Sequence, residues 1–101
     1  MEKPETGADA LLRAKDLRPD VVLVDISLPD MNGLDVAKKI KEVAPSAEVL
    51  VVSDYSEGEI KKAFMAGARG YLLKSDAGIE LATAVRTVYK KERYLSMKLR
   101  K

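Results

Sequence analysis

Each of three polar side chains directly follows an apolar run of the sequence: Asp25, Ser53 and Lys74. A carboxylate can attack phosphorus as a nucleophile and form an aspartyl phosphate. The transferred group carries a high negative charge, so it needs a cation and hydrogen-bond donors nearby, which an ammonium and a hydroxyl supply. If these side chains share one edge of a sheet, they predict a site that accepts a phosphoryl group.

A structural alternative accounts for the same residues. Asp25 and Lys74 could form a partly buried ion pair, and Ser53 could cap a nearby loop. For any single residue of the set, this alternative is the better interpretation. The position of all of them at the ends of successive predicted strands favours the phosphoryl site.

The apolar runs themselves predict three strands, at residues 21–26, 49–53 and 70–74. The runs are continuous and mostly β-branched or aliphatic, which is typical of strands covered on both faces. A helical pattern precedes each run, and another follows the last, so the predicted order is αβαβαβα.

Recognisable signals bound these helices. Capping boxes at Thr6–Asp9 and Ser56–Glu59 begin two of them, Asn32 is the expected N-cap of another, and Gly67 is expected to end the third helix. The buried positions expected from helical spacing are Val36, Ala37 and Ile40, then Ile60, Ala63 and Phe64, and in the last helix, which begins near Asp76, Ile79, Ala82, Val85, Val88 and Tyr89.

Strands that are separated by helical crossovers pair in parallel, so the predicted fold class is α/β, a three-stranded parallel sheet with flanking helices. A sequential strand order places both crossover helices on one face and the last helix on the other. Ligands of such sheets bind at the carboxyl ends of the strands, where Asp25, Ser53 and Lys74 stand. The run Val21–Ile26 would have an unpaired hydrophobic edge.

Composition limits the remaining possibilities. The chain is 47% hydrophobic and 34% charged, with a net charge of +2, which fits one globular domain over residues 1–101. It contains no Cys and no His, which excludes disulfides, imidazole catalysis and the commonest zinc sites. No apolar run could cross a bilayer and the N-terminus lacks the order of a secretion signal, so we expect a cytoplasmic protein with no membrane partner.

Basic residues gather near the end of the chain: Lys90, Lys91, Arg93, Lys98, Arg100 and Lys101. We expect them to oppose a helix C-terminal dipole and to form a basic tail at about residues 97–101. A phosphate-binding patch is the alternative. Direct DNA binding is not expected, because no helix-turn-helix follows.

Motifs that occur in order along the chain resemble those of bacterial response-regulator receiver domains. Residues 21–33 (VVLVDISLPDMNG) resemble the phosphoacceptor strand and loop, residues 51–53 (VVS) the strand with the switch hydroxyl, and residues 66–75 (AGARGYLLKS) the lysine segment. The resemblance runs from about residue 6 to residue 96. The sequences GYLLK (residues 70–74) and RYLS (residues 93–96) are similar to those of the subgroup whose receiver precedes a helix-turn-helix DNA-binding domain.

This resemblance implies a role in two-component phosphorelay signalling and transcription regulation, with a sensor histidine kinase as partner. Asp25 would be phosphorylated, and Mg²⁺ would be held by Asp25 and the backbone carbonyl of Ser27. The Ser53 hydroxyl would move to contact the phosphoryl group beside Lys74. The inward or outward rotamer of Tyr71 would report the phosphorylation state of the domain. Such a domain is a phosphoacceptor and not an enzyme, with at most self-phosphorylation from a donor and autodephosphorylation.

The chain begins where the family's second helix would begin. We therefore expect the first strand with its acidic metal-binding pair, the first helix and the second strand to be absent. The nearest spare carboxylates are Asp30, in the loop, and Asp54, which would point to the opposite face if its strand continued. Because affinity in oxygen-ligand sites depends on charge count, we expect weak or absent Mg²⁺ binding and impaired phosphotransfer.

The exposed Val21–Ile26 edge leads to a second hypothesis. Two copies could cover it by pairing edge to edge, or by exchanging a helix. We therefore expect a homodimer or a higher oligomer. The alternative function is a structural association module without chemistry.

Overall fold

The computed structural model describes residues 20–26, 32–54 and 57–99. Its strands form one parallel sheet in the order β1-β2-β3-β4. The elements are β1 (Val21–Asp25), α2 (Gly33–Val43), β2 (Glu48–Ser53), α3 (Glu57–Met65), β3 (Gly70–Leu73), the 3₁₀ turn η1 (Lys74–Asp76), α4 (Ala77–Tyr89), β4 (Tyr94–Leu95) and the 3₁₀ turn η2 (Met97–Leu99). The helix predicted from the Thr6–Asp9 box and the cap at Ser56 lie outside the described residues.

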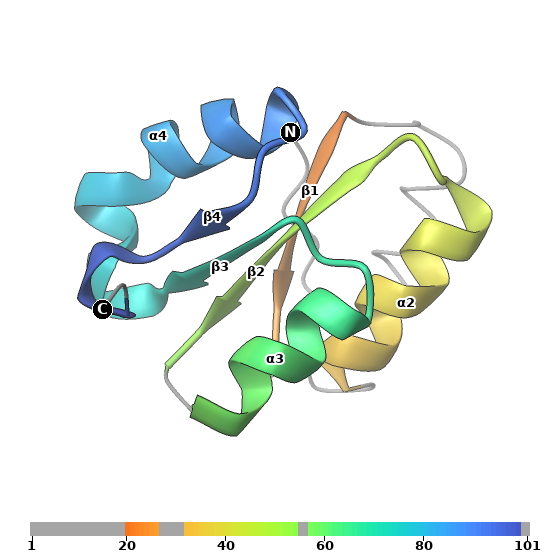
Figure 1. Cartoon of the computed structure of the whole chain (residues 1–101), viewed down its shortest axis with the longest axis horizontal. Helices are drawn as coiled ribbons and strands as arrows, with labels where there is room; N and C mark the ends of the chain where they lie inside the picture. The colour runs from red at the N-terminus through yellow and green to blue at the C-terminus, as the bar shows by residue number, and fades with distance from the viewer. Residues whose placement is uncertain (1–19, 27–31, 55–56, 100–101) are drawn as a thin grey trace.

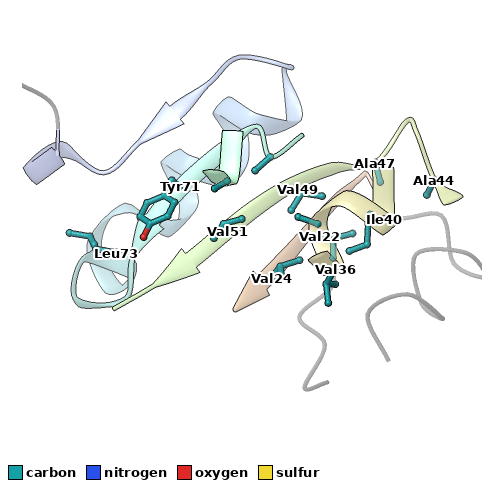
Figure 2. Close-up of a cluster of buried hydrophobic side chains, with 13 residues drawn as sticks. Val22, Val24, Val36, Ile40, Ala44, Ala47, Val49, Val51, Tyr71 and Leu73 are labelled. Carbon is teal, nitrogen blue, oxygen red and sulfur yellow. The ribbon is translucent and has the colours of Figure 1, made fainter. Parts of the chain in front are cut away.

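The helices cover the two faces of the sheet as predicted. Figure 1 shows α2 and α3 on one side and α4 on the other. Successive strand residues point to opposite faces, so Val22, Val24, Val49, Val51, Tyr71 and Leu73 share a core with α2 and α3 (Figure 2), whereas Val21, Leu23, Leu50 and Leu72 share one with α4. The α/β class and the placement of these helices are confirmed.

The expected caps form where the sequence placed them. The side chain of Asn32 accepts a hydrogen bond of 2.8 Å from the backbone N–H of Leu34, at the start of α2. Gly67 follows α3 with a φ of 102°, a left-handed conformation that favours glycine. Asn32 and Gly67 thus mark where α2 begins and where the chain leaves α3.

The prediction of three strands is wrong, because the described residues form four. Strand β4 contains only Tyr94 and Leu95, which pair with Gly70 and Tyr71 of β3. The backbone N–H of Tyr94 donates to the carbonyl of Arg69 at 3.1 Å. A strand of two residues is too short to show a period of two in the sequence, so only the tertiary pairing reveals it.

The predicted inner face of α4 is also partly wrong. Val88 is buried and Val85 packs against the core, but Ile79 is 90% exposed and Tyr89 is 60% exposed, and Ala82 is exposed as well. The buried face of the helix runs instead through Glu80, Ala84 and Val88. A charged residue lies on this face because the carboxylate of Glu80 accepts hydrogen bonds from the C-terminal segment.

Candidate functional site

The candidate site lies at the carboxyl edge of the sheet, where β1, β2 and β3 end side by side. Asp25 is opposite Val52 in the register of β1 and β2, and Ser53 is opposite Leu73 in the register of β2 and β3. Lys74 comes directly after Leu73 and begins η1. We call Asp25, Ser53 and Lys74 the rim.

An ion pair joins the two ends of the rim. The Lys74 Nζ atom lies 3.0 Å from Asp25 Oδ2, and the two side chains are 37% and 40% exposed. The hydrogen bond to Asp25 raises the pKa of Lys74 most. Burial opposes this with a lesser effect, and the charges of Asp25 and Asp54 add still smaller increases. Lys74 is therefore an ammonium at neutral pH, held on the carboxylate and open to solvent.

Asp54 adds a second carboxylate to this edge. Its Oδ2 atom lies 3.8 Å from Lys74 Nζ, although its side chain is 80% exposed. Asp54 was expected to point to the opposite face only if its strand continued, and that condition is not met, because β2 ends at Ser53. The cap predicted at Ser56 was a signal in the sequence that the strand ends here. A helix that starts at Ser56 requires the chain to turn directly after Ser53.

The two remaining described residues of the predicted site are buried. Ser53 is 4% exposed at the end of β2, and Tyr71 is fully buried in β3. In Figure 2 the Tyr71 ring lies on the same side of the sheet as Val51 and Leu73. Of the inward and outward rotamers expected for Tyr71, the ring therefore adopts the inward one.

The loop side of the site is described only in part. Ser27 and Asp30 lie outside the described residues. Within residues 20–26, 32–54 and 57–99 there is no group of three or more Asp, Glu, His or Cys side chains that could hold a metal ion. The described carboxylates therefore do not by themselves form a metal site at the rim.

Gly33 sets the position of Asp25. A Cβ atom on Gly33 would lie 2.6 Å from the Cα of Ile26 and 2.7 Å from the carbonyl oxygen of Asp25, which is closer than side chains pack. The first turn of α2 thus rests directly on the backbone that carries the rim carboxylate. The close approach requires glycine at this position.

We expect Gly33→Ala to lower the free energy of unfolding by about 1–3 kcal/mol, because the added carbon must displace backbone and not a flexible side chain. It should also shift the NMR signals of Asp25. Gly78→Ala is the matched control, since nothing lies within 4 Å of its added carbon and alanine favours helix by up to about 1 kcal/mol. Urea unfolding of both variants checks the prediction, and equal stabilities would contradict it.

The parallel α/β sheet brings an acid, an alcohol and an amine together at its carboxyl edge, which are the groups that phosphoryl transfer requires. The family model for the response regulator receiver domain matches residues 1–86. The chain is 37% identical over 93 residues to the response regulator GacA of Pseudomonas aeruginosa, which covers 91% of this chain and 44% of that protein. The chain therefore belongs to the response regulator receiver family.

Further comparisons agree. The chain is 38% identical over 95 residues to the oxygen regulatory protein NreC of Staphylococcus haemolyticus, covering 92% of this chain and 44% of that protein. A solved two-component response regulator of the LuxR family from Aurantimonas sp. SI85-9A1 superimposes with a TM-score of 0.87 at 27% identity, over 93% of this chain and 68% of that one. A LuxR-family DNA-binding response regulator from Staphylococcus aureus gives a TM-score of 0.76 at 29% identity, over 84% and 72%.

The chain thus spans less than half the length of the curated relatives that it matches. As a receiver domain it belongs to two-component signalling. Within the described residues no helix is long and apolar enough to cross a membrane.

Proposed function

We propose that this receiver domain accepts a phosphoryl group on Asp25. The observation that carries the proposal is the 3.0 Å contact between Asp25 Oδ2 and Lys74 Nζ at the carboxyl edge of the sheet. A carboxylate oxygen would form a bond to phosphorus while the bond from phosphorus to the donor's leaving group breaks, and the electron pair leaves with that group. Hydrolysis of the acyl phosphate by water would return the free carboxylate and inorganic phosphate.

The other rim residues would stabilise the phosphoryl oxygens. Lys74 is held on Asp25 as an ammonium, so it is placed to follow the negative charge when that charge moves onto the phosphoryl group. Ser53 follows Val52, the register partner of Asp25, and its hydroxyl would move to donate a hydrogen bond to the phosphoryl group. Tyr71 would then change between its inward position and an outward one.

Mg²⁺ enters this proposal only as a weakly bound ion. It would be held by Asp25 and the backbone carbonyl of Ser27, and when bound it would neutralise charge on the phosphoryl oxygens. The described carboxylates supply less charge than a strong site needs, so phosphoryl transfer should be slow. A sensor histidine kinase is the proposed natural donor, and the cytoplasmic location expected from the sequence stays a prediction.

The test uses the chain with a small phosphodonor. Incubation with acetyl phosphate and Mg²⁺ should add the mass of one phosphoryl group to the intact protein, and peptide mapping should place it on Asp25. Beryllofluoride, which mimics a bound phosphoryl group, should shift the NMR signals of Ser53 and Lys74. Absence of both effects would refute phosphoacceptance and leave Asp25 and Lys74 as an ordinary ion pair.

A second candidate function is self-association through β1. The N–H of Ile26 and the carbonyl of Asp20 bond to β2, and alternation along a parallel strand directs the backbone groups of Val21 and Leu23 the other way. No described strand pairs with that edge. We propose a homodimer formed there, edge to edge or by helix exchange. A stable monomer at micromolar concentration, measured by sizing with light scattering, would contradict it.

A further inference from the structure

The start of α2 contains an asparagine directly before a glycine. Asn32 carries the only side-chain amide of the chain, because the sequence has no other Asn and no Gln. Its side chain caps α2 by accepting from the N–H of Leu34 at 2.8 Å. Gly33 is required at the next position, because a Cβ atom there would lie 2.6 Å from the Cα of Ile26. Two separate structural requirements, a cap and a close approach, thus produce an Asn-Gly step.

An Asn-Gly step can lose ammonia by cyclisation. The backbone nitrogen of Gly33 would attack Cγ of Asn32, so that a bond from nitrogen to Cγ forms while the bond from Cγ to Nδ2 breaks. Nδ2 leaves as ammonia, with the proton that the Gly33 nitrogen gives up. Water then opens the imide ring at either of its two carbonyl carbons and yields aspartate, or isoaspartate, in which the backbone runs through the former side chain. Glycine hinders the attack least, since it has no side chain next to its nitrogen.

The cap holds the reacting groups in one ring. The hydrogen bond from the N–H of Leu34 to Asn32 Oδ1 spans Gly33, and so closes a ring of atoms that includes both Asn32 Cγ and the Gly33 nitrogen. The attack places negative charge on Oδ1, which the same N–H is positioned to stabilise. Asn32 is exposed, so water can reach it for the hydrolysis step. The capped geometry therefore favours the reaction.

A contact with β1 opposes the reaction. The N–H of Gly33 donates to the carbonyl of Ile26 at 3.3 Å, a distance beyond the usual range of about 2.7–3.2 Å. The nitrogen must release this bond and its proton before it attacks. Figure 1 shows the first turn of α2 beside the end of β1. The reaction therefore requires this turn to lift from β1, and the stability of that docking sets the rate.

We propose that Asn32 is a site of spontaneous deamidation, controlled by the docking of α2 on β1, which adds a carboxylate to the edge of the sheet that carries the rim. The aspartate product keeps the cap, because Asp and Asn cap equally well, and its charge is favourable at a helix N-terminus. The isoaspartate product adds one backbone carbon directly before Gly33, which already lies in close contact with Ile26 and with the carbonyl oxygen of Asp25. This product should therefore displace Asp25. The reaction does not require phosphoryl acceptance at the rim.

Intact mass tests the site. The chain is incubated at mildly alkaline pH, where the Gly33 nitrogen loses its proton more readily, both folded and in urea. A mass increase of one deamidation can come only from Asn32, and Asn32→Ser, which keeps a capping hydroxyl without an amide, should show none. The unfolded chain should react about ten-fold faster than the folded one, or more. A folded protein that never gains this mass would refute the site, and a rate in urea no higher than the folded rate would refute control by the fold.

A matched pair of substitutions tests whether α2 provides this control. Ala37 of α2 and Ala84 of α4 are both 0% exposed, and glycine lowers helix propensity to the same degree at each. Ala37→Gly loosens the helix that Asn32 caps, and should speed deamidation of the folded protein by about five-fold. Ala84→Gly should change the rate less. Equal increases in the two variants would mean that the reaction proceeds through unfolding of the whole domain, and would overturn control by α2.

The two products distinguish the effect on the rim. Asn32→Asp reproduces the aspartate product, and should keep the urea midpoint and the NMR signals of Asp25 close to those of the wild type. The isoaspartate form is separated from aged protein by ion exchange and identified by an isoaspartyl methyltransferase. It should have a lower urea midpoint and shifted Asp25 signals. An isoaspartate form with the stability and the Asp25 signals of Asn32→Asp would overturn the inferred displacement of Asp25.

Discussion

Replacing Glu48 with alanine is expected to lower the free energy of unfolding by about 3 kcal/mol, the largest stability effect of any substitution proposed for this domain. The Glu48 side chain is 4% exposed, and its carboxylate contacts Arg69 Nε at 3.1 Å and Lys91 Nζ at 3.0 Å. Lys41 Nζ lies 3.8 Å away. One carboxylate thus ties together α2, β2, the turn before β3 and the turn after α4.

The decrease in the free energy of unfolding should fall at the lower end of the range for broken buried ion pairs, because the cations that lose Glu48 can be solvated by water. Lys41, Arg69 and Lys91 are 25%, 35% and 61% exposed. Lys41 also donates to the carbonyls of Pro45 and Ala47, so it keeps partners. Lys91 holds a left-handed φ of 66°, an unfavourable conformation for lysine that its bond to Glu48 helps to offset.

The same network predicts how stability depends on pH. Burial by itself would raise the pKa of Glu48, but hydrogen bonds from Lys91 and Arg69 and the charges of Lys41 and Arg69 together lower it below its ordinary value of 4.5. A carboxyl with a lowered pKa in the folded state stabilises the fold above its ordinary pKa, and this contribution is lost as the pH falls through the lowered value. Stability should therefore fall from about pH 5 downward.

Urea unfolding of the wild type and of Glu48→Gln across this range checks both statements. The glutamine variant keeps the shape of the side chain but cannot titrate, so its stability should fall less steeply with acid. Glu42→Gln, on the exposed side of α2, is the matched control. If Glu48→Gln and the wild type lose stability in parallel, Glu48 is not the group that responds to acid.

Much of the fold could be predicted because the strands are continuous apolar runs with polar caps between them. Asn32 caps the start of α2 through its side chain, and Gly67 follows α3 in a left-handed conformation, as predicted for both. Because parallel strands end at one edge, the same pattern placed Asp25 beside Lys74, and the structure gives their contact. These features depend on short-range sequence and on a general rule of topology.

The errors share one physical origin, which is polar contact over a long sequence distance. Periodicity assigned Ile79 to the core and left out Glu80, because hydrophobicity does not reveal that Tyr94 and Met97 donate to the Glu80 carboxylate. Strand β4 was not predicted because it has two residues, and only their pairing with the distant β3 defines it. Glu48 was likewise unremarkable in sequence, since its cations come from positions 41, 69 and 91.

Removing the charge of Asp25 should abolish phosphoryl acceptance, and removing that of Lys74 should greatly slow it, while the domain stays folded. Asp25→Asn removes the nucleophile, so no adduct should form with acetyl phosphate. Lys74→Ala keeps the nucleophile and removes the cation beside it, and should slow adduct formation by about 100-fold or more, the usual effect of losing one preorganised donor at a developing charge. Both side chains are over one third exposed, so the urea midpoint should change little.

Intact mass measured over time, with Lys74→Arg and Lys39→Ala as companions, separates a chemical role from a structural one. Arginine keeps the charge but not the compact geometry of the ammonium, so Lys74→Arg should retain part of the rate. Lys39, on the exposed face of α2, carries the same charge away from the rim, and its loss should leave the rate unchanged. Wild-type rates in Lys74→Ala would mean that Lys74 only neutralises Asp25 in the resting protein, because a cation that contacts the phosphoryl group cannot be dispensable when that group is transferred.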